Sequence, residues 1–336
     1  MRFTLIMAFL LLCTVMSIHG QDSVIKVLSD KDYVISYTDK LNISTGLQTS
    51  NLEFIVAYPK DKLRFELSPR ETLQQFLLFQ YQWINFRYSF TPSYLNPDRS
   101  AIKGNNTRTT FDIVMAAGDA DINLVYQKAK GYYIKNMGEL DPSWRPGLPH
   151  WQLNSLTTKI LGAEFTYNIN KQFSDVGMIS GKSKQLKNAV SLLPALSIYY
   201  IHLNDPTIIA SPGTHSDDYN VDINLKFPFA ASVVWNKNWS LAGAAGPVTG
   251  INFFSTESYD VRFIKIKNKE TRWSTGFYLQ GGISHTRDHW YAGLDANLQQ
   301  SGSGDEASRT RRLFYGVELY IGKRFQAPLF LKKIFQ

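Results

Sequence analysis

Apolar and polar positions alternate with a period of two through residues 272–325. Three runs show the pattern, at 272–284, 290–299 and 313–325. Successive strand side chains point to opposite faces of a sheet, so each run predicts a β-strand with one apolar and one polar face. Gly, Tyr, Asn, Asp and Glu recur on the polar face. Alternation over segments of about 10 residues is typical of membrane β-barrels, whose outside meets lipid and whose interior meets water.

Alternation along the rest of the chain completes a set of twelve predicted strands. They are 52–67, 72–81, 84–91, 108–116, 121–133, 156–168, 190–202, 218–235, 239–254, 272–284, 290–299 and 313–325. The first strand is interrupted at 59–61 and the eighth at Pro228. Residues 41–48 also alternate, and we interpret them as an accessory strand or an early barrel strand.

The connections between these strands alternate in length. Four are very short, at 82–83, 118–119, 236–238 and 285–288, and those that follow the odd-numbered strands from the third onward are long. Short periplasmic turns and long outer loops are how outer-membrane barrels are built. The sequence therefore predicts an all-β fold, a single antiparallel transmembrane barrel of about 12 strands, with 10–14 as the range. The long connection 169–189 breaks the rule, so it is either a periplasmic excursion or a concealed hairpin.

The first twenty residues predict a cleaved secretory signal. Arg2 supplies the positive start, residues 5–15 the apolar core, and cleavage is expected after Gly20. The apolar core is shorter than the ~20 residues that span a bilayer. Cys13 is the only cysteine, so the mature chain has no disulfide and no thiolate metal site. The predicted divisions are a signal peptide at 1–20, a periplasmic lead-in at 21–51, a barrel at 52–325 and a C-terminal tail at 326–336.

The charge is mildly basic and spread out. The formal net charge is +8, and loss of Arg2 with the signal leaves +7. Without a dense Lys/Arg block, nucleic acid is not an expected partner, whereas an anionic lipid surface suits the excess. We expect outer-membrane lipid and the barrel-insertion machinery as partners, and small solutes as cargo. The oligomeric state stays open, and no cofactor is predicted.

Several segments resemble an uncharacterised family, a domain of unknown function, of predicted outer-membrane barrels from Gram-negative bacteria. They are TTFD at 109–112, VYQ at 125–127, GYY at 131–133, YNINKQFS at 167–174, and YIGKRF at 320–325 followed by AP at 327–328. The similarity covers most of the mature chain and departs from the family around 182–191, where the family is richer in small residues. The resemblance implies a barrel in the outer membrane and no particular activity.

Candidate catalytic or metal-binding residues are few. His285 and His289 are four residues apart, but they span a turn and lack a third ligand, so a polar turn is the better interpretation. One predicted outer loop gathers groups that a lipid hydrolase would need, although no strand-borne Ser faces a His at a fixed offset. These groups are His202, Asp205, His215, Ser216, Asp217 and Asp218. No catalytic, cofactor-binding or metal residue is therefore predicted.

Inward polar positions are the candidate site. The candidate lumen-lining residues are Glu164, Tyr278, Tyr291, Asp295, Glu318, Tyr320 and Arg324. They could set the ion preference of a pore, or pair with one another and fill the lumen. The prediction is a narrow pore for small polar solutes in the outer membrane. The alternatives are a structural or partner-binding scaffold and an outer-leaflet lipid hydrolase.

Most tryptophans fall at predicted strand ends. An interfacial girdle explains them, because an indole suits the headgroup region. They are Trp83, Trp235, Trp239, Trp273 and Trp290. Trp144 and Trp151 lie inside a long loop, where we expect them to pack that loop.

Overall fold

The computed structural model describes residues 33–96, 100–174, 181–205, 216–259, 265–304, 306 and 308–335. The predicted signal peptide and residues 21–32 of the predicted lead-in lie outside the described residues. The elements are β1 (Val34–Ser36), β2 (Lys40–Tyr58), η1 (Pro59–Asp61), β3 (Leu63–Ser68), β4 (Gln74–Tyr81), β5 (Ile84–Phe90), η2 (Ser93–Leu95), α2 (Ser100–Lys103), β6 (Thr107–Ala117), β7 (Ala120–Ile134), α3 (Met137–Leu140), β8 (Gln152–Tyr167), β9 (Ser183–Gln185), β10 (Ala189–Leu192), β11 (Ala195–Asn204), β12 (Ser216–Lys226), β13 (Phe229–Val234), β14 (Trp239–Tyr259), β15 (Lys265–Thr286), β16 (Trp290–Gly304), β17 (Arg309–Gln326) and α4 (Leu329–Ile334).

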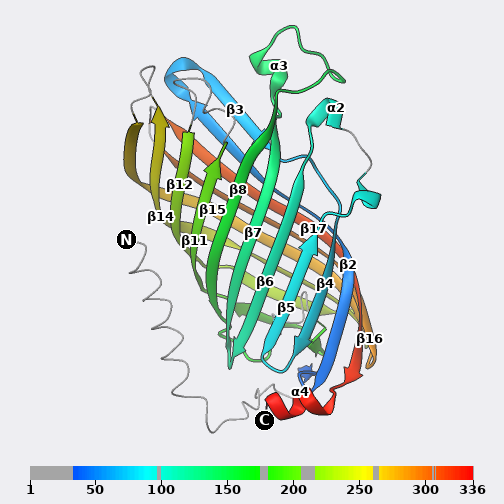
Figure 1. Ribbon diagram of the computed structural model, residues 1–336. Coiled ribbons are helices and arrows are strands. Elements are labelled where there is room, and N and C mark those ends of the chain that lie inside the picture. The colour runs from blue at the N-terminus through cyan, green and yellow to red at the C-terminus, as the bar shows by residue number, and fades with distance from the viewer. Residues whose placement is uncertain are drawn as a thin grey trace.

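Twelve strands close into one antiparallel barrel (Figure 1). Around the ring the order is β2, β4, β5, β6, β7, β8, β11, β12, β14, β15, β16 and β17, and β17 pairs with β2 to close it. Each ring strand pairs with the ring strand that follows it in the chain, so most hairpins were readable from two alternating runs. The predicted barrel and its strand number are confirmed.

The first barrel strand begins at Lys40, not at Leu52 as predicted. β2 pairs with β17 along its whole length, and with β4 over residues 42–48. The prediction failed because the apolar residues change faces within this strand. Leu47 is apolar and faces outward, whereas Leu52 and Phe54 are apolar and point into an interior cluster. Residues 52–67 are thus the upper part of β2 and a return strand, β3, joined by η1.

One end of the barrel carries the long loops and is here called the long-loop end. Near it, a different set of strands forms part of the barrel wall. There β3 pairs with β2 on one side. On its other side, Leu67 and Ser68 of β3 pair with the end of β7. β3 thus takes the place in the wall that β4, β5 and β6 hold lower down. A bulge at Gly131 of β7 accompanies this junction. Gly131 has φ +93° and its α-carbon lies against the Asn105 carbonyl, so a side chain would not fit.

Two barrel strands are broken at prolines, one of them as predicted at Pro228. Pro194 separates β10 from β11, and Pro228 separates β12 from β13. Proline donates no ladder hydrogen bond, so it ends each segment. The lower pieces stay in register, because β10 pairs with β13 and β13 with the start of β14.

The strands of the last third are longer than their apolar alternation indicated. β14 runs to Tyr259, β15 starts at Lys265, β16 runs to Gly304 and β17 starts at Arg309. Lys, Arg, Glu and Ser dominate these extensions, so no apolar period marks them. They rise above the apolar belt described below.

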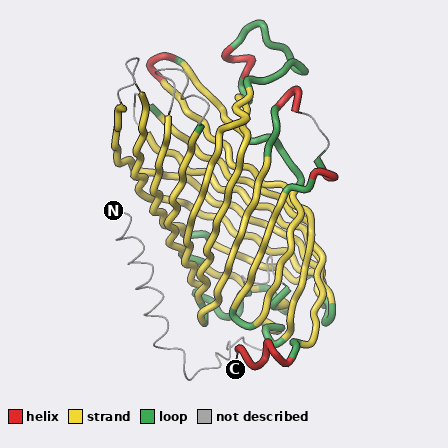
Figure 2. Tube along the Cα trace, viewed as in Figure 1, coloured by secondary structure: helices red, strands yellow, loops and turns green. Residues whose placement is uncertain are grey.

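The opposite end, here called the short-turn end, carries the tight connections and the helix α4 (Figure 2). The connections 82–83, 118–119, 235–238 and 287–289 lie here. Phe335, just after α4, packs its ring 5.3 Å from that of Tyr81 and 5.6 Å from that of Trp83. The predicted C-terminal tail therefore forms a short helix against this rim.

Connection 169–189 returns into the barrel. Its strand β9 pairs with β1 in a separate two-stranded sheet, and the described part of the connection contains no barrel hairpin. We call residues 33–38, 169–174 and 181–187 the plug. The structure thus favours the first of the two interpretations, an excursion at the short-turn end.

The outer surface of the barrel is apolar between its two ends. Outward residues with more than a third of their surface exposed include Leu77, Phe86, Phe111, Leu161, Phe165, Ile198, Ile223, Leu279, Leu294, Leu319 and Ile321. Among the described residues, no helix is both long and apolar enough to cross a membrane.

Candidate functional site: the barrel lumen

The seven candidate residues all point into the barrel. Glu164, Tyr278 and Glu318 line an internal cavity, and Asp295 lies beside it with 1% of its surface exposed. Tyr291, Tyr320 and Arg324 lie deeper, towards the short-turn end, and are also buried. Sequence parity placed these residues on the inner face, but it did not show that they occupy two levels.

Two cavities follow one another along the lumen. The upper has a volume of about 350 Å³ and the lower about 370 Å³. Both are lined mainly by polar side chains. Seven residues line both cavities and form the level at which they meet: Arg87, Asp112, Asn123, Glu164, Lys226, Tyr278 and Gln280. We call this level the charged ring.

Arg87 on β5 forms one half of the charged ring. Its guanidinium makes an ion pair with Glu318 on β17 and donates to Gln48 Oε1 at 2.7 Å. Its Cζ also lies 4.0 Å from the centre of the Phe76 ring. Arg87 thus joins β5 to β2 and β17, and its cationic head is held to one side of the lumen.

Lys226 on β12 forms the other half. Its Nζ donates to Glu164 Oε2 at 2.7 Å and to Gln299 Oε1 at 2.8 Å. The Tyr199 hydroxyl donates to the same Glu164 oxygen at 3.1 Å. Because Glu164 belongs to β8 and Gln299 to β16, these bonds cross the lumen. Neither Arg87 nor Lys226 was singled out from the sequence, although the inward parity of their strands could have identified both.

Above the upper cavity the interior turns apolar. Leu52, Phe54, Tyr132, Leu156, Ile160 and Ile201 form one buried cluster. It draws on β2, β7, β8 and β11, so it spans between strands that are not neighbours in the ring. We call it the outer cluster. Beside it, Arg312 pairs with Asp222, and the Thr158 hydroxyl donates a hydrogen bond to the Tyr132 hydroxyl at 2.8 Å.

Below the lower cavity the plug closes the lumen. Arg324 on β17 donates to the Gly181 carbonyl from Nε at 2.9 Å and from Nη2 at 2.6 Å. Its Cζ lies 3.9 Å from the centre of the Tyr37 ring and 4.8 Å from that of Tyr291. The Tyr291 ring also packs directly on the α-carbon of Gly181, where a side chain would clash. Arg324 is therefore a polar anchor of the plug within the lumen.

The plug has a second, apolar anchor and one unsatisfied charge. Phe173 is 1% exposed and packs with Ala189, Leu193 and inward alanines of β13 and β14. Lys182 is 2% exposed, and its Nζ has no hydrogen-bond partner among the described residues. Burial lowers the pKa of Lys182 to about 8, against the attraction of Asp121. The plug thus carries an ionisable group that is unfavourable in its charged form.

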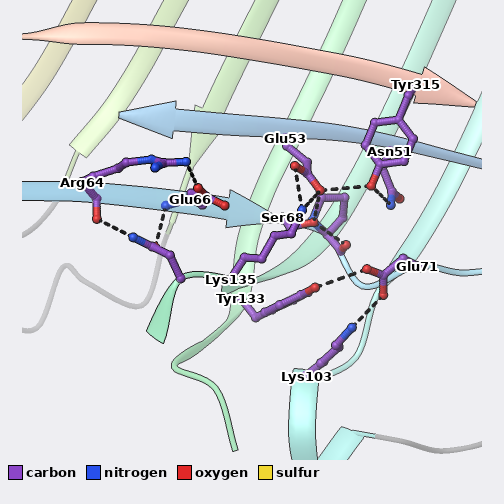
Figure 3. Close-up of polar contacts among 12 residues, drawn as sticks. Asn51, Glu53, Arg64, Glu66, Ser68, Glu71, Lys103, Tyr133, Lys135 and Tyr315 are labelled. Carbon is purple, nitrogen blue, oxygen red and sulfur yellow. Dashed lines mark hydrogen bonds and ion pairs between the residues drawn. The ribbon is translucent and has the colours of Figure 1, made fainter. Parts of the chain in front are cut away.

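A polar cluster fastens the outside of the wall where β2 leaves β4 for β3 (Figure 3). Glu53 is 2% exposed and accepts hydrogen bonds from Ser68 at 3.0 Å, Tyr315 at 3.0 Å and Lys135 at 3.1 Å. These donors come from β3, β17 and the end of β7. The cluster therefore ties together the strands that form the junction, which is a structural role.

A second carboxylate supports the same region from the loops. Glu71 accepts from Lys103 Nζ at 3.0 Å and from the Tyr133 hydroxyl at 3.3 Å. Burial, the largest single influence, would raise the pKa of Glu71, but the hydrogen bond and charge of Lys103 together with the other hydrogen bonds to this carboxylate lower that pKa. Sequence reasoning missed both clusters, because nothing in the alternation signals a branch in the wall.

The histidine candidates do not form a catalytic or metal site within the described residues. No group of three or more His, Cys, Asp or Glu side chains there could hold a metal ion. His285 lies between Trp239 and Trp290, with ring centres 4.8 Å from each. His202 is hydrogen-bonded to Asp217 and stacks on Tyr219 on the outer face of the barrel.

The other residues weighed for a lipid hydrolase lie apart from one another. Asp205 bonds to Ser155 on the inner face, and Asp218 bonds to Thr256. His215 and the Ser216 side chain lie outside the described residues. The described residues therefore bring no serine to His202.

Four of the tryptophans at predicted strand ends occupy the short-turn end. Trp83 and Trp235 lie in turns, and Trp239 and Trp290 begin their strands. Trp273 differs, because β15 starts at Lys265 and Trp273 lies within the strand, where it is 64% exposed. Trp144 packs on His150 within the long loop and donates to the Pro149 carbonyl at 3.1 Å.

Solved structures with a similar strand arrangement include outer-membrane proteins. The toluene transporter TodX of Pseudomonas putida matches with a TM-score of 0.30 and 9% identity, over 86% of this chain and 91% of TodX. The outer membrane protease OmpT of Escherichia coli matches with a TM-score of 0.33 and 8% identity, over 87% and 98%. The outer membrane protein OmpT of Vibrio cholerae matches with a TM-score of 0.31 and 8% identity, over 84% and 98%.

No curated protein matches the sequence. The family model described as "Domain of unknown function (DUF4421)" matches residues 28–325, which confirms the resemblance drawn from the sequence motifs. The chain belongs to the DUF4421 family.

Proposed function

We propose that this chain is an outer-membrane barrel that conducts small polar solutes through a narrow, normally closed lumen. The membrane placement rests on the closed ring and on the apolar belt around it. A closed barrel leaves no unpaired strand edge in the bilayer, and exposed Leu, Ile and Phe side chains suit hydrocarbon. The export signal predicted at 1–20 fits the same compartment.

The orientation follows from the two ends. The long-loop end faces the outside and the short-turn end faces the periplasm, as in other barrels of this kind. Cysteine introduced as Lys60→Cys, in η1, should react with an impermeant thiol reagent on intact cells. Cysteine introduced as Lys237→Cys, at the short-turn end, should react only after lysis. Both residues are exposed, so accessibility of the side chain does not differ between them.

The observation that carries the solute conduit is the pair of polar cavities in series. They meet at the charged ring, and their lining offers charged and polar groups to water and to small polar solutes. Five carboxylates and three cationic groups line the two cavities, a formal excess of two negative charges: Asp112, Asp121, Glu164, Asp222 and Glu318 against Arg87, Lys226 and Arg312. We therefore expect the conduit to prefer cations.

Single-channel recording in planar bilayers tests the conduit. The wild type should give discrete steps with a modest cation preference. Lys226→Gln should increase that preference and Glu164→Gln should decrease it, whereas Arg311→Gln, an exposed outward position, should leave it unchanged. Each variant's fold is checked by heat-modifiable gel migration.

One result would move the assignment to a scaffold for partner proteins. If the wild type and a variant with a loosened plug, Arg324→Ala, both leave the bilayer silent at high protein load, the cavities are not a conduit. The interior would then serve only to brace the wall.

A further inference from the structure

Two lysines face each other across neighbouring strands on the outer surface. Lys128 of β7 and Lys159 of β8 are directly paired positions in the antiparallel ladder. Both are exposed, and neither has an ion pair or hydrogen bond to another described residue. Directly opposite residues have β-carbons about 4.5–5.5 Å apart, and like charges at such positions repel. The ladder therefore holds an uncompensated pair of positive charges.

The lysine pair lies immediately above the edge of the apolar belt. One step down the same strands, Tyr126 of β7 pairs with Leu161 of β8, which pairs with Tyr200 of β11. These three side chains are between 38% and 60% exposed. Lys130, one step further up β7, is exposed as well. Along these strands towards the long-loop end, aliphatic and aromatic side chains are thus followed by ammonium groups.

A carboxylate on this face of the described strands is already engaged. Asp217 is two strands away from Lys159, across β11. It is hydrogen-bonded to His202 and accepts from the Tyr219 hydroxyl at 2.7 Å and from Asn204 at 3.2 Å. Asp217 is therefore held by β11 and β12 side chains and leaves the lysine pair available to an external anion.

We propose that Lys128 and Lys159 bind the phosphate of a phosphorylated glycolipid in the outer leaflet. A phosphate offers several acceptor oxygens, so it can bridge two ammonium groups and remove their repulsion. The acyl chains of the same lipid would lie on Tyr126, Leu161 and Tyr200, which free phosphate could not use. The proposal goes beyond the solute conduit and rests only on the proposed placement of the long-loop end at the outer leaflet.

Native mass spectrometry of the purified barrel in detergent tests the site, with bis-phosphorylated lipid A as the probe. The wild type should bind this lipid, and the double variant Lys128→Gln/Lys159→Gln should bind it roughly thirtyfold more weakly, since each lysine near a membrane surface contributes about one factor of five. The matched control Lys332→Gln/Lys333→Gln removes the same charge from α4 at the other end and should bind as the wild type does. The charge-conserving variant Lys128→Arg/Lys159→Arg should retain binding.

Equal binding by the wild type and the double Gln variant would overturn the proposal. Equal binding of lipid A stripped of its phosphates would do so as well, because the belt alone would then hold the lipid. Displacement of lipid A by an equal concentration of inorganic phosphate would assign the site to free anion instead of lipid. Labelling of Lys60→Cys reports the orientation separately, so a failure here is distinguishable from a failure of the proposed placement.

Discussion

The lumen is closed twice, and the two closures are built differently. The outer cluster consists of side chains from the wall strands themselves, buried against one another. The plug is a separate segment, held at the short-turn end by Arg324 and by the packing of Phe173. Opening the outer cluster would require the wall to deform, whereas the plug can leave without breaking any barrel ladder.

This difference between the two closures indicates which of them is expected to act as a gate. Apolar packing between wall strands contributes to the stability of the whole barrel, because it forms when the strands come together. The plug is held by separate polar contacts, such as Arg324 with Gly181 and Lys171 with Asp119, and it contains Lys182, whose charged form is unfavourable where it lies. We therefore expect the plug to move more readily than the outer cluster.

The largest expected effect is on stability, from the fixed closure. Phe54→Ala removes a ring from the outer cluster and should lower the free energy of unfolding by about 3–5 kcal/mol. Urea unfolding of the refolded barrel in detergent, followed by gel migration, measures the loss. Labelling of a cysteine in the plug, introduced as Ser183→Cys, should not change. A faster reaction at that cysteine would show that the two closures are coupled.

A smaller effect is expected from the charge in the plug. With its pKa lowered to about 8 from 10.5, the docked Lys182 releases its proton before an exposed lysine does. Docking therefore strengthens as pH rises from about 8 to 10.5 and is weakest below that window. We expect the Ser183→Cys labelling rate to fall at least tenfold between pH 7 and pH 10.

Thiol ionisation changes over the same pH range and needs a reference. Rates are divided by those of the exposed cysteine in Lys187→Cys at each pH. Lys182→Met should slow labelling at pH 7 and abolish the pH dependence. A Met variant that keeps the wild-type pH profile would rule out Lys182 as its origin.

The smallest of the three effects is expected at the polar anchor. Arg324→Ala removes two hydrogen bonds to the Gly181 carbonyl, and hydrogen bonds from a charged donor contribute about 1.5–3 kcal/mol. The variant also removes the cost of burying the guanidinium, which offsets part of this loss. We therefore expect the labelling rate of Ser183→Cys to increase about tenfold. Lys323→Ala, the exposed neighbour on the same strand, serves as the control. Identical rates in the two variants would show that Arg324 does not retain the plug.

Much of the fold was predictable, because alternate residues of a barrel strand face the outer surface and the lumen and differ in polarity. The alternation of β16 and the central parts of β15 and β17 identified the strands, and the short connections identified the hairpins. The start of β2 was lost where Leu52 and Phe54 bring apolar side chains to the inner face. The polar ends of β14 to β17 were not predicted, because both faces are polar there and apolar and polar residues do not alternate.

For the candidate site, the sequence predicted only which residues face the lumen, not which of them contact one another. Parity placed Glu164 and Glu318 inside the barrel, but their partners Lys226 and Arg87 lie on strands distant in the sequence. Arg324 was a candidate lumen-lining residue, and its hydrogen bonds to a segment that re-enters the lumen are indicated by no local pattern. The β3 junction and its Glu53 cluster arise from strand pairing across the top of three shorter strands, so they too required the structure.

The pairing of β2 with β17 dictates how the molecule must be assembled. It brings Lys40 opposite Gln326 and Ala57 opposite Arg309, which are the two extremes of the ordered ring. A ring cannot close until its final strand exists, and bringing such distant segments together carries a loop-closure entropy that slows folding. Until then, β2 and β17 both present open hydrogen-bonding edges that could join to other chains. The open edge of the first strand therefore has to be kept from other chains until the last strand has been added.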